Sequence, residues 1–402
     1  MKKSLLAIAA MTAFAGAAQA QSSVTVYGIL DVGFSSTSTR AAAKKETTNG
    51  FDQSRESSSR LGFKGTEDLG GGTSAFFTVE MGLSPQGTTM SSVNNRQSFV
   101  GLKQKGIGAA SIGTQYTVVF NAVAATDPGA SNNTVGSIIR PAGSSGNLDA
   151  GQYNASTAYT VSSTNMLIAN SDKFAGFGVN AMYVANGKNQ TQGADKTTYA
   201  FDPASSVGTP KTVVSGVGGN TNYTGWGVSA DYTWKKLYAT AAYQSFKQEQ
   251  NTGTTALGTA PAYFADTTTV SSSTNNTDNQ FYGAATYDFG ILKAYAGYVN
   301  RKVTSSINSN EYLKRTGQQI GVRSYITPKV EAWASIGNGR VNAYGANAPT
   351  ANMTAWQLGS NYYLSKRTNL YGIYGQNLTS STSNNLGGSA ASQLALGVRH
   401  TF

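Results

Sequence analysis

Apolar and polar side chains alternate along most of this chain with a period of two residues, as they do in a β-strand with two different faces. Segments of this kind recur, each roughly ten residues long, as the strands of a barrel would. We predict sixteen of them, at 24–34, 57–67, 72–83, 96–103, 108–114, 162–171, 176–185, 223–233, 237–247, 279–288, 291–302, 315–326, 329–340, 354–364, 368–377 and 393–402.

The links between these segments alternate strictly between short and long. Short links include E-D-L-G-G-G-T, K-Q-K-G-I-G and T-P-K-V. The long ones are rich in Ser, Thr, Asn and Gly, and lie at 35–56, 84–95, 115–161, 186–222, 248–278, 303–314, 341–353 and 378–392. Tight turns at one rim and long loops at the other predict an all-β fold, a transmembrane antiparallel β-barrel with short periplasmic turns and long extracellular loops. A soluble β-sandwich would not show this strict alternation of short and long links.

The two faces of several strands suit lipid and water respectively. In 60–64, Leu61 and Phe63 share one face, whereas Arg60, Gly62 and Lys64 share the other. A sheet embedded in lipid cannot leave an edge unpaired, so the last strand must pair with the first. The last strand ends the chain on an apolar face made of Leu394, Leu396, Val398, His400 and Phe402. We therefore expect an ordered C-terminus with Phe402 facing outward at the rim.

The composition supports export to a membrane. Charged residues make up 12% of the chain, about half the usual ~25% of soluble proteins, and the chain contains no Cys. Residues 1–20 combine two lysines, a short apolar core and Ala18-Gln19-Ala20, which predicts a cleaved secretory signal peptide. Residues 21–402 would then form a single barrel. Removing Lys2 and Lys3 lowers the net charge from +11 to +9.

The chain offers little material for catalysis or metal binding. With no Cys and one His, a nucleophilic triad would have to use His400, which alternation places on the outward face. Acidic residues are scattered, so neither a metal site nor a cofactor site is predicted. Basic residues are dispersed as well, which argues against nucleic-acid binding. We therefore expect no enzymatic activity.

Basic residues in mid-strand are expected to face a water-filled lumen. We assign Arg60, Lys64, Arg96, Arg323 and Arg399 to this group, because alternation places them opposite apolar neighbours and a cation facing lipid at the bilayer midplane costs roughly 2–4 kcal/mol.

Four stretches resemble the trimeric general porins of beta-proteobacteria, the neisserial and Burkholderia-type family. The most specific is S-S-R-L-G-F-K-G-T-E-D-L-G-G-G at 58–72. S-S-V-T-V-Y-G-I-L-D-V-G at 22–33 is similar to the family's first strand, N-R-Q-S-F-V-G-L at 95–102 to its fourth-strand pattern, and G-V-R-H-T-F at 397–402 to its closing strand. The resemblance covers the whole chain beyond the signal peptide.

The resemblance implies a homotrimer in the outer membrane of a Gram-negative bacterium, reached through the periplasm and surrounded by lipid and lipopolysaccharide. It implies that the third long loop, 115–161, folds into the lumen as a constriction. The wall would carry Arg60 and Arg96, and Asp127 would be the acidic member of the loop. Beside these, alternation adds Lys64 and Arg323 as basic members of the constriction, and we expect Glu80 to be a second acidic member. Phe402 would be the signal read by the barrel-assembly machinery.

Two positions depart from the family's pattern. Thr114 stands where the family commonly has an arginine, and Ala169 and Asn170 stand where it usually has a basic and an aromatic residue. Both departures remove charge or bulk near the constriction, so they affect its width and its field.

These observations favour a general diffusion porin that passes ions and small hydrophilic solutes, with weak to moderate anion selectivity from the basic wall. A substrate-specific channel and an adhesin or structural protein acting through its long loops remain alternatives.

Overall fold

The computed structural model describes residues 23–41, 44–87, 94–140, 158–190, 196–200, 211–215, 219–250, 276–306, 309–310, 312–344, 350–381 and 388–402. The predicted signal peptide lies outside these residues. The elements are β1 (Ser23–Ala41), β2 (Lys44–Gln53), β3 (Arg60–Gly70), β4 (Thr73–Gly82), β5 (Asn94–Gln104), β6 (Gly108–Tyr116), α2 (Val118–Thr126), β7 (Ser162–Ser171), β8 (Phe177–Gln190), β9 (Lys196–Ala200), β10 (Lys211–Ser215), β11 (Gly219–Trp234), β12 (Leu237–Gln250), β13 (Asn276–Asp288), β14 (Lys293–Ser305), β15 (Tyr312–Thr327), β16 (Val330–Tyr344), β17 (Thr350–Tyr363), β18 (Thr368–Thr379) and β19 (Ser389–Thr401).

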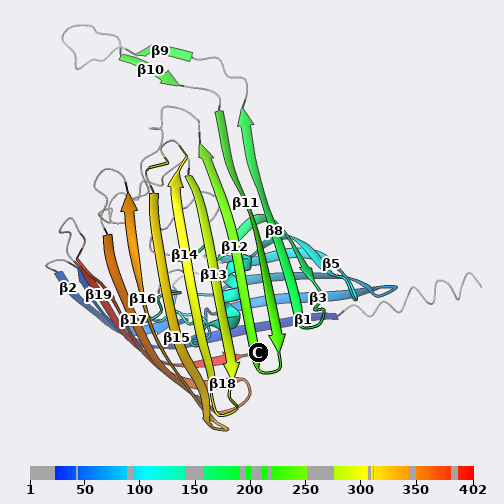
Figure 1. Cartoon of the computed structure of the whole chain (residues 1–402), viewed down its shortest axis with the longest axis vertical. Helices are drawn as coiled ribbons and strands as arrows, with labels where there is room; N and C mark the ends of the chain where they lie inside the picture. Colours follow the sequence, from blue (N-terminus) through cyan, green and yellow to red (C-terminus); the bar gives the residue numbers. More distant parts are fainter. Residues whose placement is uncertain are drawn as a thin grey trace, which may run out of the picture.

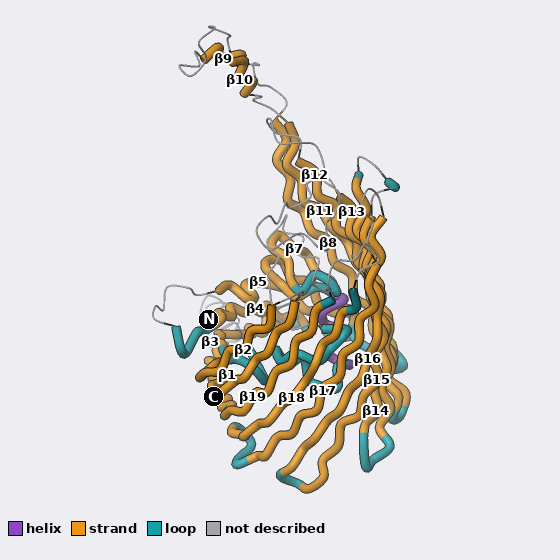
Figure 2. The backbone as a smooth tube through the Cα atoms, turned by 90° about the vertical axis from the view of Figure 1, so that its left-hand side faces the viewer, coloured by secondary structure: helices purple, strands orange, loops and turns teal. Residues whose placement is uncertain are grey.

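All strands except β9 and β10 form one closed antiparallel barrel, seen in side view in Figures 1 and 2. β2 and β3 act as one interrupted strand, because the upper part of β1 pairs with β2 and its lower part with β3. The barrel is therefore sixteen-stranded. β9 and β10 pair only with each other, in a separate two-stranded hairpin.

The sixteen predicted strands are confirmed, and so is the antiparallel barrel. Most strands continue further than predicted toward the long-loop rim. The clearest difference is at 35–56, which we expected to be a loop. Here β1 runs on to Ala41 and β2 returns from Lys44, paired residue by residue from Ala41↔Lys44 to Val32↔Gln53. The Ser, Thr and Asn side chains of this stretch suit a solvated hairpin as well as a loop, so composition alone could not distinguish the two.

Exposure follows the predicted alternation. On β1, Val24, Val26, Leu30, Val32 and Phe34 are exposed, whereas Asp31 and Ser35 are buried on the inner face. Large exposed aromatic side chains gather near the short turns, including Phe174, Phe177, Trp234, Tyr287, Phe289, Tyr325, Tyr362 and Phe402. Aromatic girdles of this kind sit where a barrel passes from hydrocarbon to head groups.

The C-terminus closes the barrel. β19 pairs with β1 from Ile29↔Thr401 to Ala41↔Ser389. The backbones of Gly28 and Phe402 exchange two hydrogen bonds of 3.0 and 3.1 Å. The Phe402 ring covers Gly28, where a Cβ would lie 2.2 Å from the ring. Phe402 is 42% exposed on the outward face, together with His400. The last residue is ordered because it is the final rung of the closing strand pair.

Residues 117–140, which follow β6, lie inside the barrel, where α2 is visible behind the wall in Figure 2. Thr117 caps the helix by accepting a hydrogen bond from the Phe120 amide at 3.2 Å. Val119 and Val123 pack on Ala242, Tyr282 and Val299 of the inner wall. The main apolar core is therefore the contact between this segment and the wall.

The described residues contain no helix that is long and apolar enough to cross a membrane.

Candidate functional site

A charged cluster lies on the inner wall where β1, β3, β4 and β5 run side by side. The Glu80 carboxylate accepts a hydrogen bond from Arg96 Nε at 2.7 Å and another from the Tyr27 hydroxyl at 3.0 Å. Arg60 Nη1 lies 3.7 Å from the same carboxylate. Arg96 Nη2 also donates to the Tyr116 hydroxyl at 2.6 Å. One carboxylate thus holds two guanidinium groups in fixed positions.

The charge of this wall is unbalanced. Glu80 is only 3% exposed, whereas the side chains of Arg60 and Arg96 keep 22% and 19% exposure. Lys64 is exposed next to them, with Nζ 5.4 Å from the centre of the Tyr27 ring. Three cations therefore face one covered anion, and the groups that reach the lumen are positive.

A β-bulge places Arg96 in this cluster. On β5, strict alternation would put Arg96 on the outward face with Val100, which is 56% exposed. The register with β4 shifts between Glu80, which lies opposite Gln97, and Met81, which lies opposite Asn95. Arg96 is the extra residue, and the bulge turns its side chain inward. The alternation argument was therefore wrong for this residue, although its inward position was expected.

The predicted basic residues Arg323 and Arg399 belong to two further inner-wall clusters, Arg323 on β15 and Arg399 on β19, the strand that pairs with β1 beside the Glu80 cluster. Arg323 makes a bidentate ion pair with Glu331, with both N–O distances 2.6 Å, and donates to the Pro128 carbonyl at 2.8 Å. Arg399 donates to Ser57 Oγ at 3.0 Å. Each is fixed to neighbours, and neither is part of the Glu80 cluster.

Asp127, predicted as the acidic residue of the inner loop, is 9% exposed and lies against the wall. Its carboxylate accepts hydrogen bonds from the Ser131 amide at 2.7 Å and from Gln319 Nε2 at 3.3 Å. Burial raises the pKa of the Asp127 carboxyl, and these hydrogen bonds and the charge of Arg140 oppose that shift. Asp127 and Glu80 are thus in different places, one on the loop and one within the basic wall.

Arg140 is a loop cation that sequence reasoning missed. It is 8% exposed, and Nη2 donates to Asn133 Oδ1 at 2.9 Å, within the same loop. Segment 115–161 holds three charged residues, Asp127, Arg140 and Asp149. Its formal charge is therefore only −1, too little to cancel the basic wall.

Five buried glutamines attach the loop to the wall, and sequence reasoning did not single them out. They are Gln244, Gln280, Gln319, Gln357 and Gln393, on β12, β13, β15, β17 and β19. Each bonds at least one loop backbone group, as at Val119 N–Gln244 (3.2 Å), Thr160 N–Gln280 (2.6 Å), Ile138 N–Gln319 (3.0 Å), Gln357–Val135 O (3.1 Å) and Val135 N–Gln393 (3.2 Å). The only available signal was a glutamine at an inward position in several strands.

These contacts leave one side of the lumen uncovered by the described loop. Residues 117–140 make hydrogen bonds to β12, β15, β17 and β19, and at their far end to the 54–58 connection. Within the described ranges, 117–140 make no hydrogen bond or ion pair to β3, β4 or β5. Residues 117–140 therefore lie mainly along β12 to β19, and within the described ranges they make no hydrogen bond or ion pair with Arg60 or Arg96.

The structure also shows the surroundings of the residues that depart from the family pattern. Thr114 lies beside Asn95, with 3.5 Å between Oγ1 and Nδ2, and Asn170 donates to Asn180 at 2.6 Å. In the described part of the chain, no three His, Cys, Asp or Glu side chains are grouped to hold a metal ion.

Comparison with known proteins gave consistent matches. A family profile described as Gram-negative porin matches residues 7–382. An outer membrane porin protein of Bordetella pertussis is 25% identical over 425 residues, covering 100% of both chains. Outer membrane porin protein 32 of Delftia acidovorans is 50% identical over 80 residues, which are 20% of this chain and 22% of that one. The solved anion-selective porin from Comamonas acidovorans has a TM-score of 0.65 at 21% identity, covering 95% of this chain and 100% of that one.

Proposed function

This chain belongs to the Gram-negative porin family, and we propose that the Arg60–Glu80–Arg96 cluster makes its channel selective for anions. The protein is an outer membrane porin, a general diffusion channel of the Gram-negative outer membrane. The observation that carries the selectivity proposal is the exposure of three cations, Arg60, Lys64 and Arg96, around a carboxylate that they cover.

The mechanism is electrostatic enrichment. Fixed positive groups at the edge of a narrow aqueous passage lower the energy of anions there and raise that of cations. Glu80 contributes by orienting both arginines while it remains covered, so its own charge acts on ions from further away. The inner loop narrows the passage, with Asp127 as its acidic residue, and the wall glutamines hold it in place. Passive diffusion needs no catalytic group, and we assign none.

Assembly follows from the same architecture. We propose a homotrimer whose closing strand, ending at Phe402, is recognised by the barrel-assembly machinery, and whose outer wall contacts lipid and lipopolysaccharide. The exposed Phe402 ring on the short-turn rim supports the recognition step. We propose 21–402 as the exported barrel.

The test is a planar-bilayer measurement of single-channel conductance and zero-current potential under a KCl gradient. The wild type should give ohmic steps that close in thirds and a potential that favours Cl⁻. Arg60→Gln with Arg96→Gln should lower the Cl⁻/K⁺ permeability ratio on the order of tenfold, since each lost charge changes it about threefold. The control is Arg40→Gln with Lys45→Gln, an exposed cross-strand pair on the β1–β2 hairpin.

The outcomes separate the alternatives. A wild-type preference for K⁺, or a double variant no different from its control, would reject the selectivity proposal while keeping the porin. Saturation of the current by one solute class would indicate a substrate-specific channel. Host-surface binding that survives block of the pore would support the adhesin reading.

A further inference from the structure

The wall of the barrel is interrupted between β2 and β3, where residues 54–59 form a connection that is not part of the strand ladder. The connection begins at Ser54, whose φ of 63° lies in the left-handed region, which is uncommon for a residue with a side chain. Ser59 closes the connection, because its amide donates a hydrogen bond to Ser54 Oγ at 2.9 Å. Contacts other than strand pairing must therefore hold these residues in position.

Asp31 of β1 supplies these contacts. Its side chain is fully buried on the inner face, and Oδ2 accepts hydrogen bonds from the amides of Glu56 at 2.9 Å and Ser57 at 2.6 Å. Its backbone amide donates to Ser59 Oγ at 3.0 Å, and its carbonyl accepts from the Ser54 amide at 2.9 Å. Hydrogen bonds to a carboxylate are roughly twice as strong as those between neutral groups. Asp31 thus holds the connection at both ends and in the middle.

The strands that close the barrel fix the Asp31 carboxylate from its other side. Tyr371 of β18 reaches across β19, and its hydroxyl donates to Asp31 Oδ1 at 2.7 Å. It can cross because β19 has a glycine there: a Cβ on Gly397 would lie 2.3 Å from the Tyr371 hydroxyl oxygen. Arg399, also on β19, donates to Ser57 Oγ at 3.0 Å. Both carboxylate oxygens are therefore in use, and their orientation is set by β18 and the connection together.

The connection in turn contacts both parts of the constriction. The Asn133 amide of the inner loop donates to the Arg55 carbonyl at 2.9 Å, and Asn133 Nδ2 donates to the Ser54 carbonyl at 2.7 Å. On the basic wall, Arg60 Nε donates to the Ser58 carbonyl at 2.9 Å. A shift of the connection would therefore move the loop and release a wall arginine at the same time.

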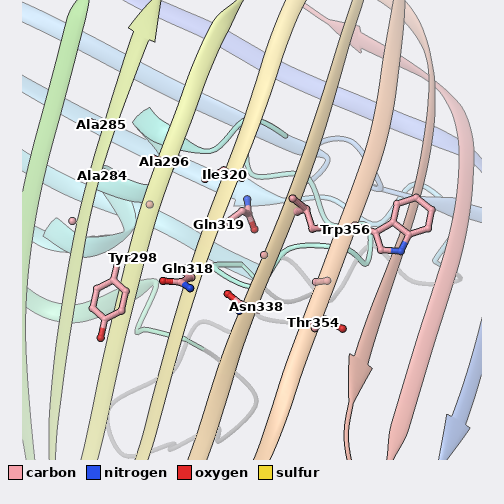
Figure 3. A pocket seen from close by; sticks show the side chains of 15 residues that line it. Ala284, Ala285, Ala296, Tyr298, Gln318, Gln319, Ile320, Asn338, Thr354 and Trp356 are labelled. Carbon is pink, nitrogen blue, oxygen red and sulfur yellow. The ribbon is translucent and has the colours of Figure 1, made fainter.

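The loop is attached differently at β15. Gln319, labelled in Figure 3 among the side chains that line a wall pocket, accepts hydrogen bonds from Ser137 Oγ at 2.9 Å and from the Ile138 amide at 3.0 Å. Gln319 belongs to a strand that is paired on both sides, so the barrel itself sets its position. The carbonyls that bind Asn133 belong instead to a connection held by one carboxylate. A side-chain change at Asp31 can therefore release the Asn133 contact without any change in the loop.

We propose that Asp31 is the positioning residue of the constriction. It does not line the passage, and it acts through the connection, which it orients to bind the loop at Asn133 and the wall at Arg60. This inference rests on the proposed function where it concerns Arg60 and selectivity, whereas the attachment of the loop is independent of the sign of selectivity. Three of the stretches that resemble the porin family, 22–33, 58–72 and 397–402, meet in this contact.

The test compares two variants that remove the same charge. In Asp31→Asn, the amide oxygen can still accept from the Glu56 and Ser57 amides, and the amide nitrogen can donate to the Tyr371 hydroxyl oxygen. The connection should therefore keep its position. Asp31→Ala removes all of these side-chain hydrogen bonds. Because both variants lose one negative charge, a difference between them reports on position and not on charge.

The readouts are the stability of the open level in single-channel recordings and the zero-current potential under a KCl gradient. Asp31→Asn should have a steady open level, like the wild type. Asp31→Ala should switch between sublevels on the order of tenfold more often, as expected for the loss of one or two hydrogen bonds. Its Cl⁻/K⁺ permeability ratio should be up to about threefold below that of Asp31→Asn, which is the contribution of one wall charge.

The matched control is Asp288→Ala at the short-turn rim, where the carboxylate also accepts a backbone amide, that of Gly290, at 2.7 Å. This variant should keep a steady open level. Folding of every variant is checked by its heat-dependent mobility on gels. If Asp31→Ala does not fold, Asp31→Glu replaces it, because it keeps the charge but displaces both oxygens by one methylene, and it should show the same switching.

Equal open levels and equal permeability ratios in folded Asp31→Ala and Asp31→Asn would overturn the proposal and leave Asp31 a purely structural residue. Equal switching in both variants would also overturn it, because the charge would then matter and not the position. A wild type that prefers K⁺ would reject the selectivity proposed above, and the comparison of open levels would still decide the role of Asp31.

Discussion

Replacing Glu80 by Gln tests the constriction most directly, because it removes one charge from the centre of the basic wall without removing volume. The carboxylate lies 2.7 Å from Arg96 Nε, and an anion in contact with that guanidinium adds about 3 Å. At a separation of about 6 Å in water, the Coulomb energy is ~0.7 kcal/mol, which screening at 0.1 M salt reduces to ~0.4 kcal/mol.

That energy changes the local concentration of each ion about 1.9-fold, upward for anions and downward for cations. The Cl⁻/K⁺ permeability ratio should therefore rise about 3.5-fold in Glu80→Gln. The assay is the zero-current potential in 0.1 M-range KCl gradients. Glu46→Gln, an equal charge change on the exposed β1–β2 hairpin, is the control and should leave the ratio unchanged.

The same variant should lose stability. Removing one partner of a fully buried ion pair costs about 3–5 kcal/mol, but Arg60 and Arg96 keep partial contact with lumen water. We expect a loss of about 1–3 kcal/mol in the free energy of unfolding, measured by urea titration of tryptophan fluorescence in detergent. An unchanged or lower Cl⁻/K⁺ ratio in a folded variant would refute the arrangement of a covered anion behind exposed cations.

Three further predictions concern the scaffold of the site. Deleting Asn95 removes the β5 bulge and should turn Arg96 toward lipid, at a cost of about 2–4 kcal/mol in unfolding free energy, which Arg96→Leu in the same chain should restore. Gln357→Leu removes hydrogen bonds to Thr134 and Val135 carbonyls of the inner loop, so single-channel recordings should show larger current noise and a stability loss of about 1–3 kcal/mol. Gly28→Ala places a Cβ against the Phe402 ring and should slow barrel assembly, as followed by heat-modifiable gel mobility.

Each of these predictions has a result that contradicts it. A bulge deletion that folds normally with Arg96 retained would mean that the bulge does not place this side chain. Quiet, unchanged channels in Gln357→Leu would mean that the loop is held mainly by its apolar contacts. Normal assembly of Gly28→Ala would mean that the Phe402 ring moves aside without cost.

The barrel itself was largely predictable from the sequence. Lipid on one side and water on the other force each strand to alternate, and the alternation is readable at positions such as Leu61 and Lys64 without any structure. The alternation of short and long links predicted the antiparallel order of the strands. Because a sheet in lipid cannot leave an edge unpaired, the last strand, β19, had to pair with β1. These constraints act on each residue through its near neighbours in the chain, so they can be recognised in the sequence alone.

The interior of the pore was decided by the tertiary structure. The bulge that turns Arg96 inward is a register shift between two strands, and the covering of Glu80 depends on side chains from β1, β3 and β5. The wall glutamines become recognisable only when the loop lies against them. Away from bulges, alternation determines which face a residue is on, but it cannot tell which residues of distant strands meet, because that depends on register, shear and the path of the loop.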